Sequence, residues 1–196
     1  MTIQARRRAL LLGAGALVAL PHGASAQRAA TVTRVGFLSA ASAATYSKNW
    51  DVLKAALRDA GHIEGKNIEF EVRWADGASD RLPELARELV RRKVDVIVTH
   101  GTLGALALKQ ATATIPIVCV GISDPMASGI VASLARPGGN ITGFSILSEQ
   151  LYEKRLALLK EAVPRIRRVA FLMNPGNPVY GPMFESMQAT AKSVGV

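Results

Sequence analysis

The stretch VDVIVTHGTLGALALKQATATIPIVCVG, residues 94–121, contains two apolar runs with a helical pattern between them. Residues 94–99 and 115–121 are short and rich in β-branched side chains, as in buried strands, and residues 102–111 have the length and composition of a helix. A strand, a helix and a second strand in this order form a right-handed βαβ unit with parallel strands. The stretch therefore predicts an α/β fold built on a parallel sheet.

The same alternation extends on both sides of this unit. Further strands are predicted at 34–39, 67–74 and 140–144, and further helices at 49–61, 80–93 and 127–135. Charged and apolar side chains alternate in 67–74, which favours a strand near a sheet edge, whereas 94–99 and 115–121 are apolar enough for burial on both faces. Ser79 or Asp80 would cap the helix at 80–93. The prediction is a doubly wound, Rossmann-like first lobe over residues 33–145.

A different arrangement begins after residue 145. An amphipathic helix is predicted at 148–164, then a strand ending in a Pro/Gly/Asn loop within 167–178, then a helix from residue 180. The first lobe already has its strands, so this strand would open another sheet. Residues 146–196 are therefore predicted to be the start of a second α/β lobe, which is incomplete in this chain.

The N-terminal residues have the layout of a secretory signal peptide. Arg6–Arg8 precede an uncharged apolar run at 9–20, and Ala24-Ser25-Ala26 follows as a small-residue cleavage site. The apolar run is shorter than the roughly 20 residues that span a membrane. We expect residues 1–26 to be removed and the mature protein to be periplasmic, without a membrane span. No Phe follows the arginines, which favours general secretion over the twin-arginine route.

Composition and motifs argue against several function classes. The net charge is +9, but the basic residues lie in helix patterns mixed with acidic ones, which is typical of solvated faces rather than of a nucleic-acid site. No P-loop, dinucleotide fingerprint or nucleophile elbow is present, and the three histidines lack metal-ligand spacing. The single cysteine, Cys119, lies in an apolar run and is interpreted as a buried hydrophobe. We expect no catalysis, cofactor or metal.

Small polar loops follow several of the predicted strands. They lie at 39–42, 100–102, 123–125 and 174–177, and each leads into a predicted helix start. In an open parallel sheet, ligands bind outside the carboxyl ends of the strands, and a helix start favours an anionic group. These loops are either a binding edge or ordinary caps and turns.

Two longer stretches carry a family resemblance. SDPMASGIVASLARPGGNITGFS at 123–145, with KRLALLKEAVPRIRRVAFLMNPGNP at 154–178, resembles the periplasmic substrate-binding components of ABC transporters, in a branch described as tryptophan- or tyrosine-binding. The resemblance implies two lobes of the type I periplasmic-binding-protein fold, which close on a small molecule and deliver it to an ABC permease in the inner membrane. Members of that family are much longer than this chain. We therefore expect weak ligand binding and poor solubility from residues 1–196 alone.

The resemblance also implies a set of ligand-binding residues. Asp124 would take an amino group and the amides at Gly101-Thr102 a carboxylate, so the ligand would be an amino acid or a similar zwitterion. The implied residues are Ser39, Ser42, Gly101, Thr102, Ser123 and Asp124 in the first lobe, and Asn174 and Asn177 in the second. One alternative is a ligand-sensing domain of a signalling or regulatory system, which shares the fold. Another is a doubly wound hydrolase, which would need a nucleophile and a base in contact.

Overall fold

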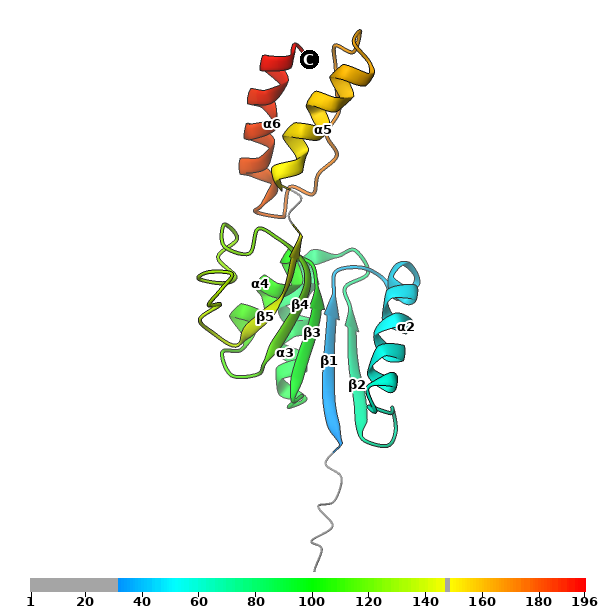
Figure 1. The fold of residues 1–196 in the computed structure, drawn as a ribbon. Coiled ribbons are helices and arrows are strands. Elements are labelled where there is room, and N and C mark those ends of the chain that lie inside the picture. Colours follow the sequence, from blue (N-terminus) through cyan, green and yellow to red (C-terminus); the bar gives the residue numbers. More distant parts are fainter. Residues whose placement is uncertain (1–31, 147–148) are drawn as a thin grey trace, which may run out of the picture. The chain divides into compact units, whose positions relative to one another are not determined.

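The computed structural model describes residues 32–146 and 149–196 (Figure 1). The first stretch contains β1 (Thr33–Ser39), α2 (Ala43–Asp59), β2 (Ile68–Trp74), the 3₁₀ turn η1 (Ser79–Arg81), α3 (Leu82–Arg91), β3 (Val96–His100), α4 (Thr102–Ala111), β4 (Ile117–Ser123) and β5 (Ile141–Ile146). The second stretch contains α5 (Glu149–Ala162) and α6 (Tyr180–Val194). The predicted signal peptide lies outside the described residues.

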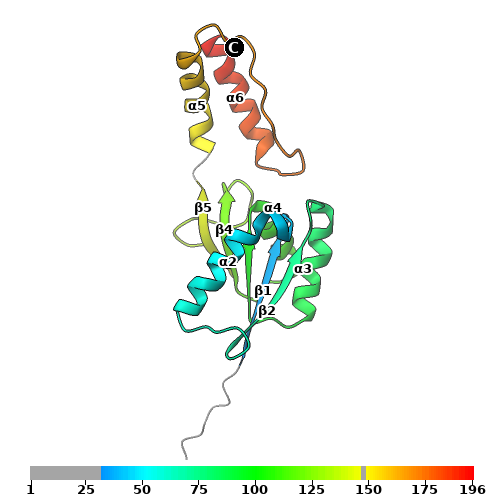
Figure 2. The same ribbon diagram turned by 90° about the vertical axis from the view of Figure 1, so that its right-hand side faces the viewer.

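The strands of the first stretch form one parallel sheet of five strands in the order β2-β1-β3-β4-β5. The chain passes from β1 to β2 on one side and then places β3 on the other side of β1. Strand order therefore reverses between β1 and β3. The helix α2 lies on one face of the sheet, and α3 and α4 lie on the other (Figures 1 and 2). This is the doubly wound α/β lobe that the sequence predicts.

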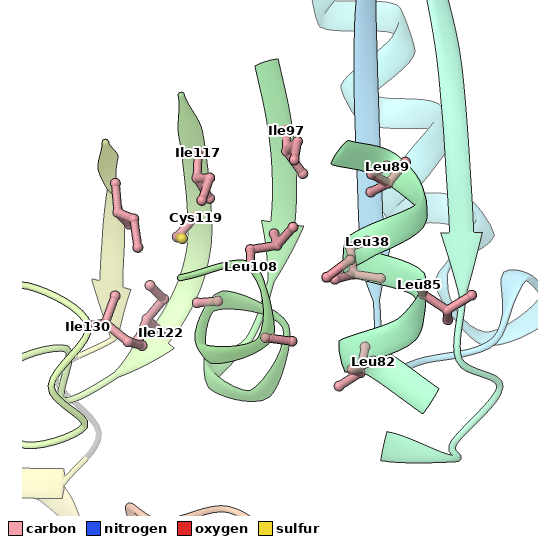
Figure 3. Packing of buried hydrophobic residues seen from close by; sticks show 14 of the residues in the cluster. Leu38, Leu82, Leu85, Leu89, Ile97, Leu108, Ile117, Cys119, Ile122 and Ile130 are labelled. Atoms are coloured by element: carbon pink, nitrogen blue, oxygen red, sulfur yellow. The ribbon is translucent and has the colours of Figure 1, made fainter. Parts of the chain in front are cut away.

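The core lies between the sheet and the pair α3 and α4. Leu38 and Ile97 point from the sheet toward Leu89 and Leu108 of the helices, and all four side chains are fully buried (Figure 3). Burying one such side chain stabilises the fold by about 1.5–3 kcal/mol. Cys119 lies in the same cluster, and burial raises the pKa of its thiol to about 12. The thiol therefore stays protonated, and the prediction of a structural cysteine is confirmed.

The strand β2 is an edge strand, as predicted. Its charged side chains form ion pairs on the sheet surface: Arg73 Nε donates to Glu88 Oε2 at 2.8 Å, and Arg73 Nη1 lies 3.3 Å from Glu71 Oε2. The hydrogen bond from Arg73 lowers the pKa of the Glu88 carboxyl. Charges on an edge strand hinder pairing with another chain, so this edge is protected.

Residues 127–135 do not form the predicted helix. They fold into turns, with Gly129 at φ +68° and the amides of Ile130 and Val131 donating to the Pro125 carbonyl. Ile130 is 3% exposed and packs beside Ile122 in the core (Figure 3). Ile130 is therefore apolar because it is buried in the core, not because it lies on one face of a helix. The left-handed conformation of Gly129 interrupts helical geometry.

The strand predicted within 167–178 is also absent. Residues 167–173 form neither strand nor helix, and Leu172 is 98% exposed. A strand needs a neighbour for its backbone hydrogen bonds, and residues 149–196 supply none. The helices α5 and α6 do form as predicted and pack against each other, with Phe171 stacked on Phe184.

Two helix starts also differ from the prediction. The helix α2 begins at Ala43, six residues before the predicted start, because Ser42 and Thr45 form a capping box. Residues 79–81 form a 3₁₀ turn, so neither Ser79 nor Asp80 caps α3, whose N-cap is Arg81.

Strands β3 and β4 are not buried on both faces, which corrects another prediction. Val120 is 41% exposed, and its register partner Phe144 in β5 is 75% exposed. Ile146, two residues further along β5, is 49% exposed. We call these three residues the open sheet face. They carry no charge, and β5 has none either, unlike β2. An uncharged apolar face beside an exposed edge strand favours association with other chains.

The open sheet face predicts self-association of this chain. Replacing Phe144 by serine removes the most exposed of the three apolar side chains, and we expect the oligomeric fraction in sedimentation velocity to fall severalfold. Ile63→Ser is the matched control, because Ile63 is also exposed, at 38%, but lies between α2 and the edge strand β2, at the opposite edge of the sheet from β5. Equal effects of the two variants would contradict a role for this face.

Candidate ligand-binding site

The loops singled out in the first lobe lie at one edge of the sheet. Ser39 at the end of β1 is in register with His100 at the end of β3, which pairs in turn with Val120 of β4. The loops at 39–42, 101–102 and 123–124 follow these strand ends directly. They flank the point between β1 and β3 where strand order reverses, which is where open α/β sheets bind ligands.

The two serines after β1 are engaged within their own loop. Ser39 is fully buried, and its Oγ accepts a hydrogen bond from the Ala41 amide at 3.1 Å. Ser42 is the N-cap of α2: its Oγ accepts from the Thr45 amide, and Thr45 Oγ1 accepts from the Ser42 amide, both at 3.2 Å. Ser42 is half-buried, so only this serine presents side-chain atoms to solvent.

The loop after β3 leads into α4. Gly101 has φ +82°, and its amide donates to the Val120 carbonyl at 3.0 Å, so this amide is already engaged. No side chain caps α4, and its first amides, beginning at Thr102, have no acceptor within the helix. Thr102 itself is 4% exposed. The donors that this loop leaves available are thus the amides from Thr102 onward rather than the Gly101 amide.

The loop after β4 holds Asp124 in an unusual conformation. Its φ is +29°, in the left-handed region that residues other than glycine seldom adopt. Oδ1 accepts from the Ala127 amide at 2.9 Å, and the Asp124 carbonyl accepts from the Ser128 amide at 3.0 Å and the Ser128 hydroxyl at 2.8 Å. Strained residues of this kind concentrate at functional sites. Among the described residues, its second oxygen, Oδ2, has no hydrogen-bond partner.

The two asparagines of the second stretch organise the turn before α6. Asn174 Oδ1 accepts from the Gly176 amide at 2.9 Å, and Asn177 Oδ1 accepts from the Val179 amide at 3.2 Å. Asn174 is exposed and Asn177 half-buried. Both are turn-forming residues in this structure, and their predicted contact with ligand stays a prediction.

An aromatic group that the sequence did not place lies beside the loops. Tyr46 in the first turns of α2 has its ring centroid 4.8 Å from His100 and 6.0 Å from Trp74. Burial lowers the pKa of His100, so its imidazole is neutral at neutral pH. Trp50 and Trp74 both pack on Phe37, with ring centroids 4.8 and 5.1 Å away. Tyr46 was missed because α2 was predicted to begin after it.

The described residues contain neither a metal-ligand cluster nor a membrane-spanning helix. Within residues 32–146 and 149–196, no three His, Cys, Asp or Glu side chains are grouped so as to hold a metal ion. Over the same residues no helix has the length and apolar character needed to cross a membrane.

Known structures share this fold. A conserved domain protein from Vibrio cholerae O1 biovar El Tor is 31% identical with a TM-score of 0.75, and 85% of this chain aligns with 55% of that one. A Streptococcus pneumoniae ABC domain, solved in complex with L-Trp, is 21% identical with a TM-score of 0.72 over the same shares. The chain thus spans about half the length of these structures.

Sequence comparisons identify the family. A tyrosine-binding protein of Clostridioides difficile is 33% identical over 119 residues, which are 61% of this chain and 34% of that protein. The family model described as ABC transporter substrate binding protein matches residues 35–196. This match covers α5, α6 and the whole sheet except the first residues of β1. The chain therefore belongs to the ABC transporter substrate-binding protein family.

Proposed function

We propose that this chain is the solute-binding part of an ABC import system, and that it captures an amino acid without chemical conversion and passes it to a permease in the inner membrane. Membership of a substrate-binding family supports a binding protein over an enzyme. Similarity to a tyrosine-binding protein and to a domain that binds L-Trp supports an amino acid as ligand. The signal-peptide pattern of residues 1–26 supports a periplasmic location.

The observation that carries the proposal is the arrangement at the carboxyl edge of the sheet. Asp124 offers a carboxylate oxygen to an amino group, and the uncapped start of α4 offers amides and a positive helix end to a carboxylate. The two groups follow neighbouring strands, β4 and β3. Ser42 and Ser123 add polar atoms at the same edge, whereas the side chains of Ser39 and Thr102 are buried beneath it. Asn174 and Asn177 would close the site from the second lobe.

The proposal predicts that Asp124→Ala abolishes ligand-induced stabilisation. Wild-type protein should show a rise in melting temperature with millimolar L-tryptophan or L-tyrosine, because a ligand that binds only the folded state stabilises it. The Asp124→Ala variant should show no rise, since the partner of the ammonium group is gone. The measurement is differential scanning fluorimetry with and without each amino acid.

The control for this experiment is Asp59→Ala. Asp59 is an exposed carboxylate at the far end of α2 and makes only a surface ion pair with Arg58, at 3.9 Å. This variant should keep the full ligand-induced rise. A rise that persists in the Asp124 variant would contradict the assigned contact.

A further inference from the structure

Buried hydroxyl groups lie directly beneath the candidate site. Among the described residues, four buried side chains are polar, and three of them stand at the carboxyl ends of β1 and β3 or at the start of α4: Ser39, Thr99 and Thr102. Thr99 Oγ1 donates to the Leu38 carbonyl at 2.9 Å. The fourth, Thr112, lies at the opposite end of the sheet, after α4. A buried hydroxyl needs a hydrogen-bond partner, and those at this edge hold the backbone of neighbouring strands and loops.

Thr102 makes the contact that reaches Asp124. Its Oγ1 accepts a hydrogen bond at 3.3 Å from the amide of Ser123, the residue before Asp124. Thr102 belongs to the first turn of α4 and Ser123 to the end of β4, so the bond joins the loops that follow two adjacent strands. With Thr102 only 4% exposed, its hydroxyl is directed to this backbone group rather than to solvent.

Asp124 is thereby held from both sides. On its C-terminal side, the Ala127 amide donates to the Asp124 side chain and the Ser128 amide donates to the Asp124 carbonyl. On its N-terminal side the Thr102 hydroxyl fixes Ser123. A left-handed aspartate persists only where its surroundings over-determine its conformation. Removing one of the two restraints should let the residue relax and move its carboxylate.

We propose that Thr102 is a positioning residue: its hydroxyl does not contact the ligand but holds Asp124 in the conformation that presents the carboxylate to the ligand's amino group. This inference rests on the proposed function of Asp124. The family resemblance implies a ligand contact through the Thr102 amide, and this inference gives the hydroxyl a separate role.

The test compares Thr102→Val with Thr102→Ser. Valine keeps the shape of threonine but leaves the Ser123 amide without its acceptor, whereas serine keeps the acceptor. We expect the valine variant to exchange the Ser123 amide hydrogen at least tenfold faster and to bind L-tryptophan about tenfold more weakly, in line with the loss of one hydrogen bond. The serine variant should match wild type in both measurements.

Thr112→Val separates positioning from general loss of stability. Thr112 is also buried, and its Oγ1 accepts from the Thr114 and Ile115 amides, both at 3.2 Å, but it has no link to Asp124. It should lower the melting temperature of the ligand-free protein and leave the affinity unchanged. An equal loss of affinity in the Thr102 and Thr112 variants would overturn the proposal, as would unchanged affinity in Thr102→Val.

A ligand-independent measurement distinguishes this inference from the proposed function. The coupling between the amide and α protons of Asp124, measured by NMR, reports its φ angle without ligand. If wild-type protein binds no amino acid, the proposed function fails, and an unchanged coupling in Thr102→Val then overturns the positioning role as well. If wild type binds and Asp124→Ala does not, but Thr102→Val binds normally, only the positioning role fails.

Discussion

Replacing Gly143 by alanine is expected to destabilise the first lobe by about 4 kcal/mol or more. Gly143 lies in β5 at φ +145°, and a Cβ built there would overlap the backbone carbonyl oxygen of Cys119 in β4. Backbone strain of this kind costs about 1–3 kcal/mol and overpacking a further 1–3 kcal/mol. Domains of this size are stable by only about 5–15 kcal/mol, so a quarter of the margin or more is lost. Urea unfolding followed by circular dichroism measures the change.

Gly139→Ala is the matched control for this prediction. Gly139 lies in the turn before β5, where nothing lies within 4 Å of the position that a Cβ would take, and its φ is not in the left-handed region. Its stability should stay within about 0.5 kcal/mol of wild type, the usual range for surface substitutions. A Gly143 variant as stable as the Gly139 variant would show that β4 and β5 do not approach as described.

Gly104→Ala is expected to cost about 2 kcal/mol or more, although alanine favours helix. A Cβ at Gly104 of α4 would overlap Thr99 Oγ1, which is fully buried and hydrogen-bonded to the Leu38 carbonyl. The hydroxyl would have to move, and its lost hydrogen bond adds about 1–3 kcal/mol to the packing cost. Thermal unfolding of the variant provides the measurement.

A second substitution tests the cause of that loss. In Gly104→Ala combined with Thr99→Ala, the hydroxyl that collides with the new methyl group is absent, so the double variant should cost less than the two single changes added together. Gly181→Ala in α6 is the control, since nothing lies within 4 Å of its Cβ position, and it should stabilise the helix slightly. Strict additivity of the Gly104 and Thr99 effects would contradict the close approach of α4 to β3.

The class of fold was predictable because apolar runs of strand length alternate with helical patterns along residues 34–144. The edge position of β2 was also predictable, since Glu69, Glu71 and Arg73 suit only a solvated strand. The turns at 127–135 were not predictable. Ile130 is buried against Ile122 in the core, and the sequence pattern does not distinguish this from burial on one face of a helix. The same holds for β4, whose apolar Val120 lies on the α2 side of the sheet and is nevertheless 41% exposed.

The candidate site was predictable in position but not in the role of each residue. Polar loops after strands indicate the binding edge of a parallel sheet, and the loops at 39–42, 101–102 and 123–124 do lie together. Burial is a tertiary property, so the sequence could not show that the Ser39 and Thr102 side chains face inward. Nor could it show the left-handed φ of Asp124 or the hydrogen bond between Thr102 and the preceding residue, Ser123.

The central claim is that an amino acid binds at the carboxyl edge of the sheet, between the start of α4 and Asp124. The most direct test is an NMR titration of the 196-residue chain with L-tryptophan, with backbone amides assigned. We predict that the largest shifts fall on the loops at 39–42, 101–103 and 123–128 and are lost in Asp124→Ala. Shifts that instead gather on the outer surface of α2, or that persist in Asp124→Ala, would contradict the account.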